Sequence, residues 1–363
     1  MTDHENPRHS ALKVQAGIQQ PESVNLQAVS RFSRSKKGLM LPEEYAQGIL
    51  AGNRTILSKA ITLIESSLAV HYQLAQDVIA LCLPHAGKSV RIGITGVPGV
   101  GKSTFIEVFG KHLTSIGHKL AVLAIDPSST SSKGSILGDK TRMEELSTDE
   151  NAFIRPSPSS GSLGGVARKT RETIILCETA GYDVILVETV GVGQSEIAVH
   201  SMVDFFLLLM LAGAGDELQG IKRGIMEMAD GVLINKADGD NMKRVNVAMA
   251  ELRNALHFYP PTESGWQPVC EACSSLTKAG IPRTYEMIMD FVAFTKSNGY
   301  FDKRRLQQSR EIMMSVIDQT LHDHFYHHTE IKKMMHKIEA ELQQEKISAY
   351  IAAQQLIEKY FNL

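Results

Sequence analysis

The sequence lacks any long hydrophobic run. Its longest uninterrupted apolar stretch, Phe205 to Ala212, has the length of a strand, whereas a membrane-spanning helix needs about 18 or more apolar residues. We therefore expect no transmembrane segment. The formal net charge of the 363 residues is only -2, which gives no reason to expect binding to nucleic acid or to an anionic membrane.

Cysteine is also scarce. The four cysteines are too few for a disulfide scaffold and suit a reducing compartment, so we expect a cytoplasmic protein. Cys270 and Cys273 form a C-x-x-C pair, but a single pair is weak evidence for zinc. We interpret both as the end of a strand and the loop after it. The other two are Cys82 and Cys177.

The first 40 residues are polar and contain no apolar signal core. A basic patch at residues 31–37 could be the remnant of an organelle-targeting segment, but several acidic residues argue against that. A disordered tail over residues 1–40 is the better interpretation. The spacing of apolar residues then predicts an N-terminal helical segment over residues 41–88, with a break at Gly52-Asn53-Arg54.

Six short apolar runs alternate with segments of helix length between residues 89 and 296. This pattern predicts an α/β fold, in which a mostly parallel sheet is flanked by helices. Ligands of such sheets bind at the carboxyl ends of the strands. The expected strands are Ile92–Thr95, Leu120–Ile125, Val184–Val187, Phe205–Leu211, Gly231–Ile234 and Pro268–Cys273.

The first of these runs enters a loop that fits G-x-x-x-x-G-K-[ST] and precedes a helical pattern. Glycines let backbone N–H groups surround a phosphate, and the helix N-terminus adds partial positive charge. Lys102 can reach the β- and γ-phosphates, and the Ser103 hydroxyl can bind Mg²⁺. We expect a P-loop nucleotide site built from Gly96, Val97, Pro98, Gly99, Val100, Gly101, Lys102, Ser103 and Thr104.

Residues 235–238, Asn-Lys-Ala-Asp, match the guanine-recognition signature N-K-x-D. The Asp238 carboxylate can accept hydrogen bonds from guanine N1–H and the 2-amino group, a donor pair that adenine lacks. The Lys236 stem can lie over the base, and Asn235 can tie this loop to the phosphate loop. After the last strand, Ser274, Ser275 and Leu276 lie where GTPases place a short loop whose backbone contacts the base oxygen, so we expect them to bind the nucleotide as well.

The run Glu188-Thr189-Val190-Gly191 occupies the place of the D-x-x-G switch motif. Glu188 would orient Mg²⁺, and the Gly191 amide would contact the γ-phosphate. Val192 stands where small GTPases have the Gln that positions water, and Gln194 is a possible substitute. We therefore expect slow intrinsic hydrolysis that a partner or dimer contacts accelerate.

Mg²⁺ prefers oxygen ligands, and two further carboxylates lie in the right region. Asp126 could instead cap a helix, and Asp139 could stand in a solvated turn. The glycine-rich segment Pro156 to Gly165 could be a passive loop, but we favour a switch that orders around the γ-phosphate. The candidate metal ligands are Ser103, Asp126, Asp139 and Glu188.

Combined, these stretches resemble the MeaB/ArgK family, GTPase chaperones of adenosylcobalamin-dependent methylmalonyl-CoA mutase. The resemblance runs from near Leu41 to near Tyr360 and implies slow GTP hydrolysis, a homodimer, and loading and protection of the mutase cofactor. It also implies a mobile loop over residues 213–222, where Gln219 and Lys222 would link partner binding to hydrolysis; a polar turn is the alternative. The stretches are Gly96–Thr104, Asp126–Met143, Arg155–Gly165, Tyr182–Glu196, Gly213–Lys222 and Asn235–Asn241.

Residues 297–363 read as long helices with apolar stripes that need a covering surface, and the resemblance favours a dimerisation segment. One stripe is Met313, Ile317 and Leu321. Within the cluster His322–His328, His324 and His328 would share a helix face, but two ligands make a poor metal site. A solvated or interfacial face is the better interpretation.

Two other functions remain open. A nucleotide-dependent kinase linked to amino-acid transport would need an acceptor pocket and a base near the γ-phosphate, and the sequence shows no distinct one. A non-catalytic nucleotide sensor would fit the missing Gln. The resemblance to mutase chaperones rests on analogy.

Overall fold

The computed structural model describes residues 39–126, 143–158, 163–189, 195–213, 223–260 and 262–362. Residues 42–363 form one unit around a seven-stranded sheet in the order β3-β2-β4-β1-β5-β6-β7, in which every neighbouring pair is parallel. The α/β prediction is confirmed. The strands are β1 (Val90–Gly96), β2 (Leu120–Asp126), β3 (Ala152–Pro158), β4 (Val184–Thr189), β5 (Phe205–Leu211), β6 (Gly231–Asn235) and β7 (Val269–Ala272).

Strand β3 was missing from the six predicted strands. Its last residues include Pro156 and Pro158, which the sequence placed in a glycine-rich loop. Proline cannot donate to a sheet and is tolerated at an edge. Among the described strands β3 pairs with β2 alone, so its prolines leave no interior ladder broken. Of the predicted switch, residues 159–162 lie outside the described part of the chain.

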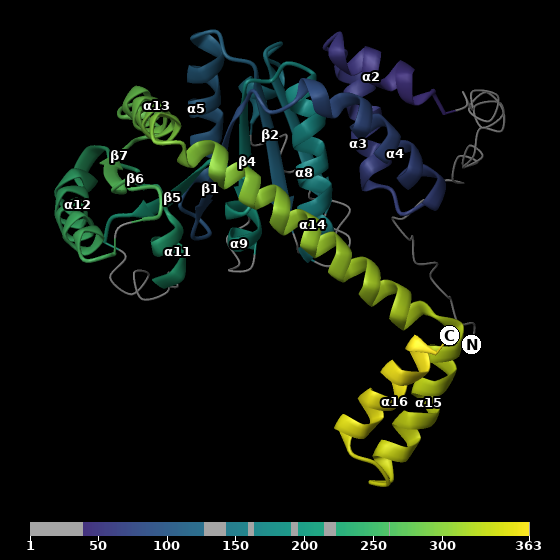
Figure 1. Ribbon diagram of the computed structural model, residues 1–363. Helices are drawn as coiled ribbons and strands as arrows, with labels where there is room; N and C mark the ends of the chain where they lie inside the picture. The colour runs from purple at the N-terminus through teal and green to yellow at the C-terminus, as the bar shows by residue number, and fades with distance from the viewer. Residues whose placement is uncertain are drawn as a thin grey trace, which may run out of the picture. The chain divides into compact units, whose positions relative to one another are not determined.

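Helices cover both faces of the sheet (Figure 1). On one face, Phe205 packs edge-on against Phe291 of α13, with ring centroids 5.1 Å apart. On the other face, a Cβ at Gly93 would lie 2.8 Å from Val199, so the close approach of α9 requires glycine there. The first face carries α5 (Lys102–Ser115), α7 (Glu144–Ser147) and α13 (Ile281–Ser297), and the second carries α8 (Leu163–Thr179), α9 (Ser195–His200), α11 (Arg223–Met228) and α12 (Met242–His257).

Three N-terminal helices and a 3₁₀ turn precede the sheet, as the apolar periodicity predicted. Asn53 caps α3 at the expected break, because its side chain accepts from two N–H groups of the first turn. Arg54 donates to the Ala152 carbonyl and Glu65 pairs with Arg155, which fastens α3 to the edge strand β3. The elements are α2 (Pro42–Leu50), α3 (Arg54–Glu65), α4 (Ala69–Cys82) and η1 (Leu83–His85).

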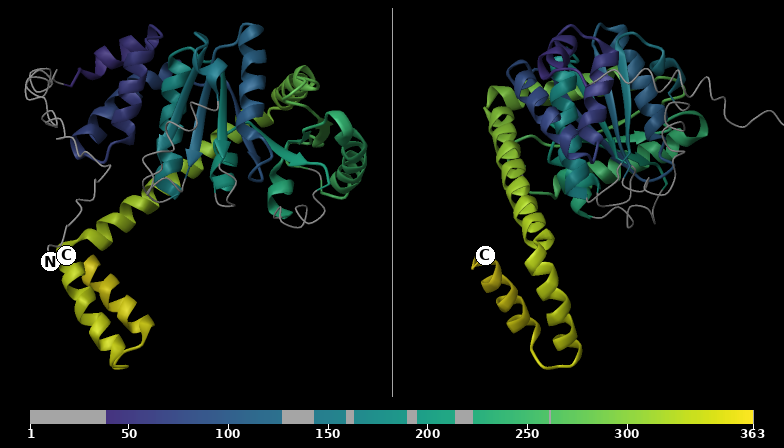
Figure 2. Two further views of the ribbon diagram at one scale, coloured as in Figure 1. Left: turned by 180° about the vertical axis from the view of Figure 1, so that it is seen from behind. Right: turned by 90° about the vertical axis from the view of Figure 1, so that its right-hand side faces the viewer.

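Three helices follow α13: α14 (Tyr300–His327), α15 (Thr329–Gln343) and α16 (Ala349–Phe361). Figure 2 shows α15 and α16 side by side as a hairpin. Ile331 and Ile338 are buried in it, whereas the stripe of Met313, Ile317 and Leu321 on α14 remains exposed. None of the helices that the structure describes has the length and hydrophobicity needed to cross a membrane.

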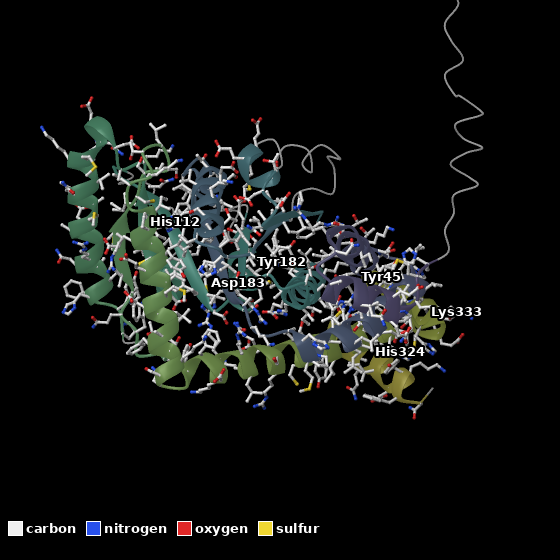
Figure 3. The ribbon with its side chains drawn as sticks, turned by 90° about the horizontal axis from the view of Figure 1, so that it is seen from above. Tyr45, His112, Tyr182, Asp183, His324 and Lys333 are labelled. Atoms are coloured by element: carbon white, nitrogen blue, oxygen red, sulfur yellow. The ribbon has the colours of Figure 1, made fainter. Side chains whose placement is uncertain are left out.

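The histidine cluster lies where α14 meets this hairpin, and Figure 3 labels His324 there. His328 stands between α14 and α15 rather than on α14. His324 Nδ1 lies 2.6 Å from the hydroxyl of Tyr360. In the described ranges no three His, Cys, Asp or Glu side chains are grouped to hold a metal ion.

Candidate functional site: a phosphate loop and a base-recognition loop

The phosphate loop leaves the carboxyl end of β1 and runs into α5. Gly96, Gly99 and Gly101 all have positive φ, a conformation that side chains with a Cβ rarely adopt. A Cβ at Gly96 would also lie 2.5 Å from the Leu209 carbonyl of β5. The loop can therefore follow this path only with glycine at these positions, which explains why the phosphate loop is rich in glycine.

Lys102 is buried, and its Nζ donates to the carbonyls of Gly96 at 2.8 Å and Val97 at 3.3 Å. The lysine thus spans its own loop, with its charge held where phosphate oxygens would bind. Burial lowers the pKa of Lys102, and the nearby carboxylates of Glu188 and Glu196 counter this by raising it. The two carboxylates favour the protonated amine that binding an anion requires.

Glu188, in β4, lies beside the start of α5. The hydroxyl of Ser103 donates to its Oε1 at 3.2 Å, and Glu188 is buried. A hydroxyl and a carboxylate at this place are the hard oxygen donors that Mg²⁺ takes, so the residues present fit that ion. Asp126 is the last residue of β2, but its side chain lies outside the described part of the structure, and so does Asp139.

The loop after β6 is tied directly to the phosphate loop. Asn235 Nδ2 donates to the Val100 carbonyl at 2.9 Å, and Lys236 Nζ donates to the Gly99 carbonyl at 3.0 Å. Lys236 has a φ of 58°, which is unusual for a residue with a side chain. The sequence predicted the Asn235 tie, and the structure adds the second tie through Lys236.

Asp238 is held by the loop after β7. The hydroxyl of Ser274 donates to Asp238 Oδ2, and the backbone N–H of Thr277 donates to that hydroxyl at 3.0 Å. Ser275 donates to Asn235 Oδ1 at 3.3 Å, and Leu276 is 81% exposed. The sequence assigned this loop a backbone role, whereas in the structure the two serine side chains orient the base-recognition residues. Two adjacent hydroxyls after a strand were the available signal.

The C-x-x-C pair is part of the strand and loop, as expected. Cys270 lies in β7 and Cys273 follows it; both are buried free thiols in two different core clusters. Burial raises the pKa of Cys270 to about 11 and that of Cys273 to about 12. Such thiols remain protonated at neutral pH and are poor metal ligands.

Several predicted residues cannot be placed. Gly191, Gln194, Gln219 and Lys222 lie outside the described residues, so their roles stay predictions. The sequence analysis in turn missed Glu196, a buried carboxylate in the first turn of α9 whose charge acts on Lys102. Its signal was weak, since an acidic residue in a first helical turn is common.

The parallel sheet, with a glycine loop between β1 and α5 that is tied to the loop after β6, defines a P-loop nucleoside triphosphatase. A family model described as methylmalonyl Co-A mutase-associated GTPase MeaB matches residues 57–330. This chain therefore belongs to the MeaB family, and it is a GTPase.

Similar proteins span bacteria and animals. The GTPase ArgK of Escherichia coli K12 is 48% identical over 275 residues, which cover 76% of this chain and 83% of ArgK. The methylmalonic aciduria type A homolog, mitochondrial, of Mus musculus is 46% identical over 323 residues, 86% of this chain and 78% of the mouse protein. A crystal structure of an LAO/AO transport system kinase superposes with a TM-score of 0.71 at 36% identity, covering 89% of this chain and 99% of that one.

Proposed function

We propose that this GTPase is a chaperone of an adenosylcobalamin-dependent methylmalonyl-CoA mutase, and that its nucleotide state governs loading and protection of the mutase cofactor. The observation that supports this proposal is the MeaB family match over residues 57–330, since the family description itself names association with the mutase. The mouse relative, named for methylmalonic aciduria, agrees with it.

The nucleotide would lie across the two tied loops. Lys102, released from the carbonyls of its own loop, would bind the β- and γ-phosphates, and the loop amides would surround them. Asp238, oriented by Ser274, would accept the two guanine N–H donors. Lys236 would cover one face of the base. Because hydrogen bonds join the two loops, binding of the base at one loop would affect binding of the phosphates at the other.

Mg²⁺ would be held by Ser103 and Glu188, with Asp126 and Asp139 as further ligands implied by the resemblance. When bound, the ion neutralises phosphate charge during hydrolysis. The contribution of Glu188 is to hold the Ser103 hydroxyl in place next to the phosphate loop.

Calorimetric titration with GDP and with ADP, in the presence of Mg²⁺, tests the base assignment. Wild-type protein should bind GDP tightly and ADP weakly. Asp238→Ala should lose about 100-fold or more in GDP affinity, because two hydrogen bonds to a charged acceptor disappear. Asp240→Ala, an exposed acidic neighbour two residues along, is the matched control and should behave as wild type. Equal binding of GDP and ADP by the wild type would refute guanine recognition.

The chaperone role needs a separate assay with methylmalonyl-CoA mutase. GTP turnover should be slow alone and rise when the mutase is added, and retention of adenosylcobalamin by the mutase should depend on whether GDP or a non-hydrolysable GTP analogue is present. Unchanged turnover and unchanged cofactor retention would contradict the chaperone proposal without contradicting the assignment as a GTPase.

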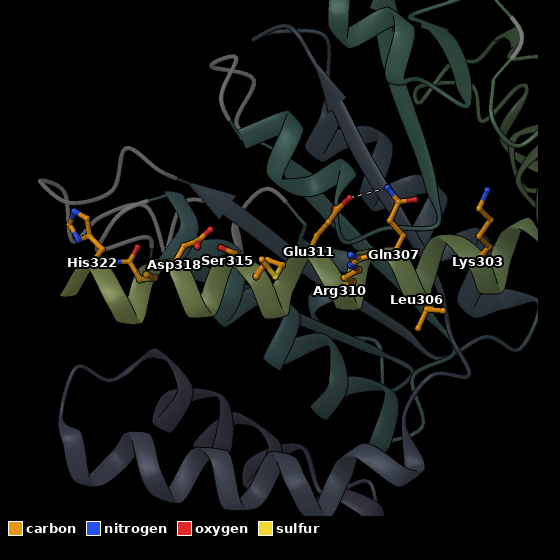
Figure 4. A pocket seen from close by; sticks show the side chains of 10 residues that line it. Lys303, Leu306, Gln307, Arg310, Glu311, Ser315, Asp318 and His322 are labelled. Atoms are coloured by element: carbon orange, nitrogen blue, oxygen red, sulfur yellow. Dashed lines mark hydrogen bonds between the residues drawn. The ribbon is translucent and has the colours of Figure 1, made fainter. Parts of the chain in front are cut away.

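We also propose that the functional unit is a homodimer formed through α14. This helix exposes a groove of about 960 Å³ whose lining includes Leu306 and Met314, and Figure 4 shows its polar members Gln307 and Glu311 joined by a hydrogen bond of 3.1 Å. Leu306 is 73% exposed and Met314 is 49% exposed, and apolar side chains that lie together on an exposed surface mark interaction sites. A second copy of the same helix would cover it.

Light scattering after gel filtration tests the dimer. Met314→Glu, in the lining of the groove, should give a monomer because it places a charge in the contact. Asp323→Asn, at an exposed polar position of the same helix outside the groove lining, should stay dimeric. A monomeric wild type at micromolar concentration would count against this interface.

A kinase is the second candidate, and the observation that favours it is the similarity to the protein described as an LAO/AO transport system kinase. Transfer of the γ-phosphate from labelled GTP to a basic amino acid or to a protein acceptor would support it. Release of all label as free phosphate would favour the GTPase chaperone.

A further inference from the structure

The last residue of α9, His200, and the connection to β5, residues 201–204, are held by three side chains of α14. Arg304 donates to Nε2 of His200 at 3.0 Å and to its carbonyl at 3.3 Å. Gln308 donates to the Val203 carbonyl at 2.8 Å. Arg305 makes two bonds to the buried Asp204, at 2.8 and 2.7 Å. Successive groups of this short connection are thus fixed by one helix.

The residues in these contacts are largely removed from water. Asp204 and Gln308 are buried, and the Arg305 side chain is 16% exposed. His200 packs edge-on against the Phe206 ring at 5.5 Å. Breaking one of these hydrogen bonds would leave a buried polar group unpaired, which is costly. A movement of α9 is therefore expected to move α14 with it.

The first turn of α9 acts on the phosphate loop through its charge. Glu196, in its first turn, is buried and acts electrostatically on Lys102 of the phosphate loop. Val199 of the same helix packs against Gly93 of β1, the strand that delivers that loop. One short helix therefore carries, in its first turn, a carboxylate whose charge acts on the phosphate loop. Of its last two residues, one packs against the strand that delivers this loop and the other accepts a hydrogen bond from α14.

His200 supports this arrangement as a neutral acceptor. Burial lowers the pKa of His200 to about 4, and the charge of Arg304 lowers it further in the same direction. Near neutral pH its Nε2 is then free to accept a hydrogen bond from Arg304. The contact persists over the whole physiological range.

We propose that α9 is the mechanical link between the nucleotide site and the C-terminal helices: a change at the phosphates moves α9, and the Arg304–His200, Gln308–Val203 and Arg305–Asp204 contacts pass that movement to α14. The inference rests on the nucleotide site proposed above and adds a route from it to α14, the helix proposed as the dimer contact. By linkage, whatever binds α14 must alter nucleotide affinity by the same factor.

Hydrogen exchange measured by mass spectrometry on the full chain tests this route. Protein is compared free, with GDP and with a non-hydrolysable GTP analogue. The test variant is Arg304→Ala combined with Gln308→Ala, and the matched control is Thr320→Ala combined with Asp323→Ala, two exposed polar side chains on the same helix that do not line the groove. His200→Gln is the milder variant in case the double substitution lowers stability. Melting temperature and oligomeric state are recorded for each.

In the wild type and in the control, exchange in residues 300–312 should differ between GDP and the analogue by at least about fivefold, the lower end of ordinary coupling. In the test variant this difference should vanish, while nucleotide still protects residues 96–104 and 235–238. A wild type whose α14 ignores the nucleotide, or a folded test variant whose α14 still responds, overturns the link. Absence of protection at residues 96–104 in the wild type would instead overturn the nucleotide site, and the link with it.

Discussion

The strands of the sheet have their carboxyl ends along one side, here called the carboxyl edge, and their amino ends along the opposite side, the amino edge. The two are built in different ways. At the carboxyl edge, short motifs form the candidate site: the glycine loop after β1, Glu188 in β4 and the Asn235–Asp238 run after β6. At the amino edge, charged pairs join residues far apart in sequence: Arg305 with Asp204, and Arg91 with Glu178. Asp183, labelled in Figure 3 beside the start of β4, belongs to this edge too and accepts the Lys119 N–H at 2.8 Å.

This comparison indicates which residues serve nucleotide binding and which serve the stability of the fold. The carboxyl edge holds groups such as Lys102 in bonds to its own loop, which a ligand can replace. At the amino edge, the pairs of Arg305 with Asp204 and of Arg91 with Glu178 join largely buried charges, which no ligand replaces. We therefore expect substitutions at the amino edge to cost stability and those at the carboxyl edge to cost nucleotide binding.

The largest expected effect is at the amino edge. Asp204→Asn should lower the free energy of unfolding by about 3 to 5 kcal/mol, because it leaves the mostly buried Arg305 without its counter-charge. Urea unfolding at pH 7 measures it, with the exposed Asp323→Asn on α14 as control. Below the unfolding transition the ratio of GDP to ADP affinity should stay unchanged. A loss under 1 kcal/mol would remove the distinction between the edges.

Asn235→Ala should have the next largest effect, and on binding. Its loss unties the base loop from Val100 and leaves buried groups unpaired, which costs about 2 kcal/mol or roughly 30-fold in GDP affinity. Calorimetric titration with GDP measures this, and Asn246→Ala, exposed on α12, is the control. Unchanged GDP affinity in the variant would show that the tie is dispensable.

The pH dependence of stability separates two groups that line one cavity of about 320 Å³ at the amino edge. Burial lowers the pKa of His200 to about 4, so its unfolded state binds more protons and stability is lost as pH falls from about 6.5 towards 4. Burial raises the pKa of Asp230 to about 6, so its folded state binds more protons and stability is gained as pH falls from about 6 towards 4.

From pH 7 to pH 5, His200 should cost about 2 kcal/mol and Asp230 should contribute about 1 kcal/mol, which partly cancel in the wild type. Relative to the wild type, His200→Gln should become more resistant to urea on acidification, and Asp230→Asn less resistant. Urea midpoints at the two pH values measure both. Shifts of the same sign in the two variants would contradict the opposed pKa directions.

The smallest expected effect tests the serine that the sequence analysis assigned to a backbone role. Ser274→Ala removes the hydroxyl that holds Asp238, and should reduce the preference for GDP over ADP by about fivefold, near 1 kcal/mol. Competition binding with both nucleotides measures it, with the exposed Ser309→Ala on α14 as control. A preference equal to that of the wild type would return Ser274 to a purely backbone role.

Periodicity and motifs predicted six of the seven strands and the helices before and after the sheet. The sequence patterns missed β3 because its prolines are typical of a loop. That stretch is a strand because it pairs with β2 at the edge of the sheet. They placed Asn235 against the phosphate loop, since the motif carries that contact within itself. They missed the Ser274 hydroxyl and Glu196, whose partners are set by how loops and helices meet.

By itself the sequence determined the phosphate loop, the base-recognition run and the parallel alternation of strands and helices. These features are local, because backbone conformation at glycine and the spacing of apolar residues act within a few residues. Only the tertiary structure decided that Arg304, Arg305 and Gln308 hold the connection after α9, and that Asp230 and His200 line one cavity. Those contacts join segments far apart in the chain, and burial gives them their strength only after the chain has folded.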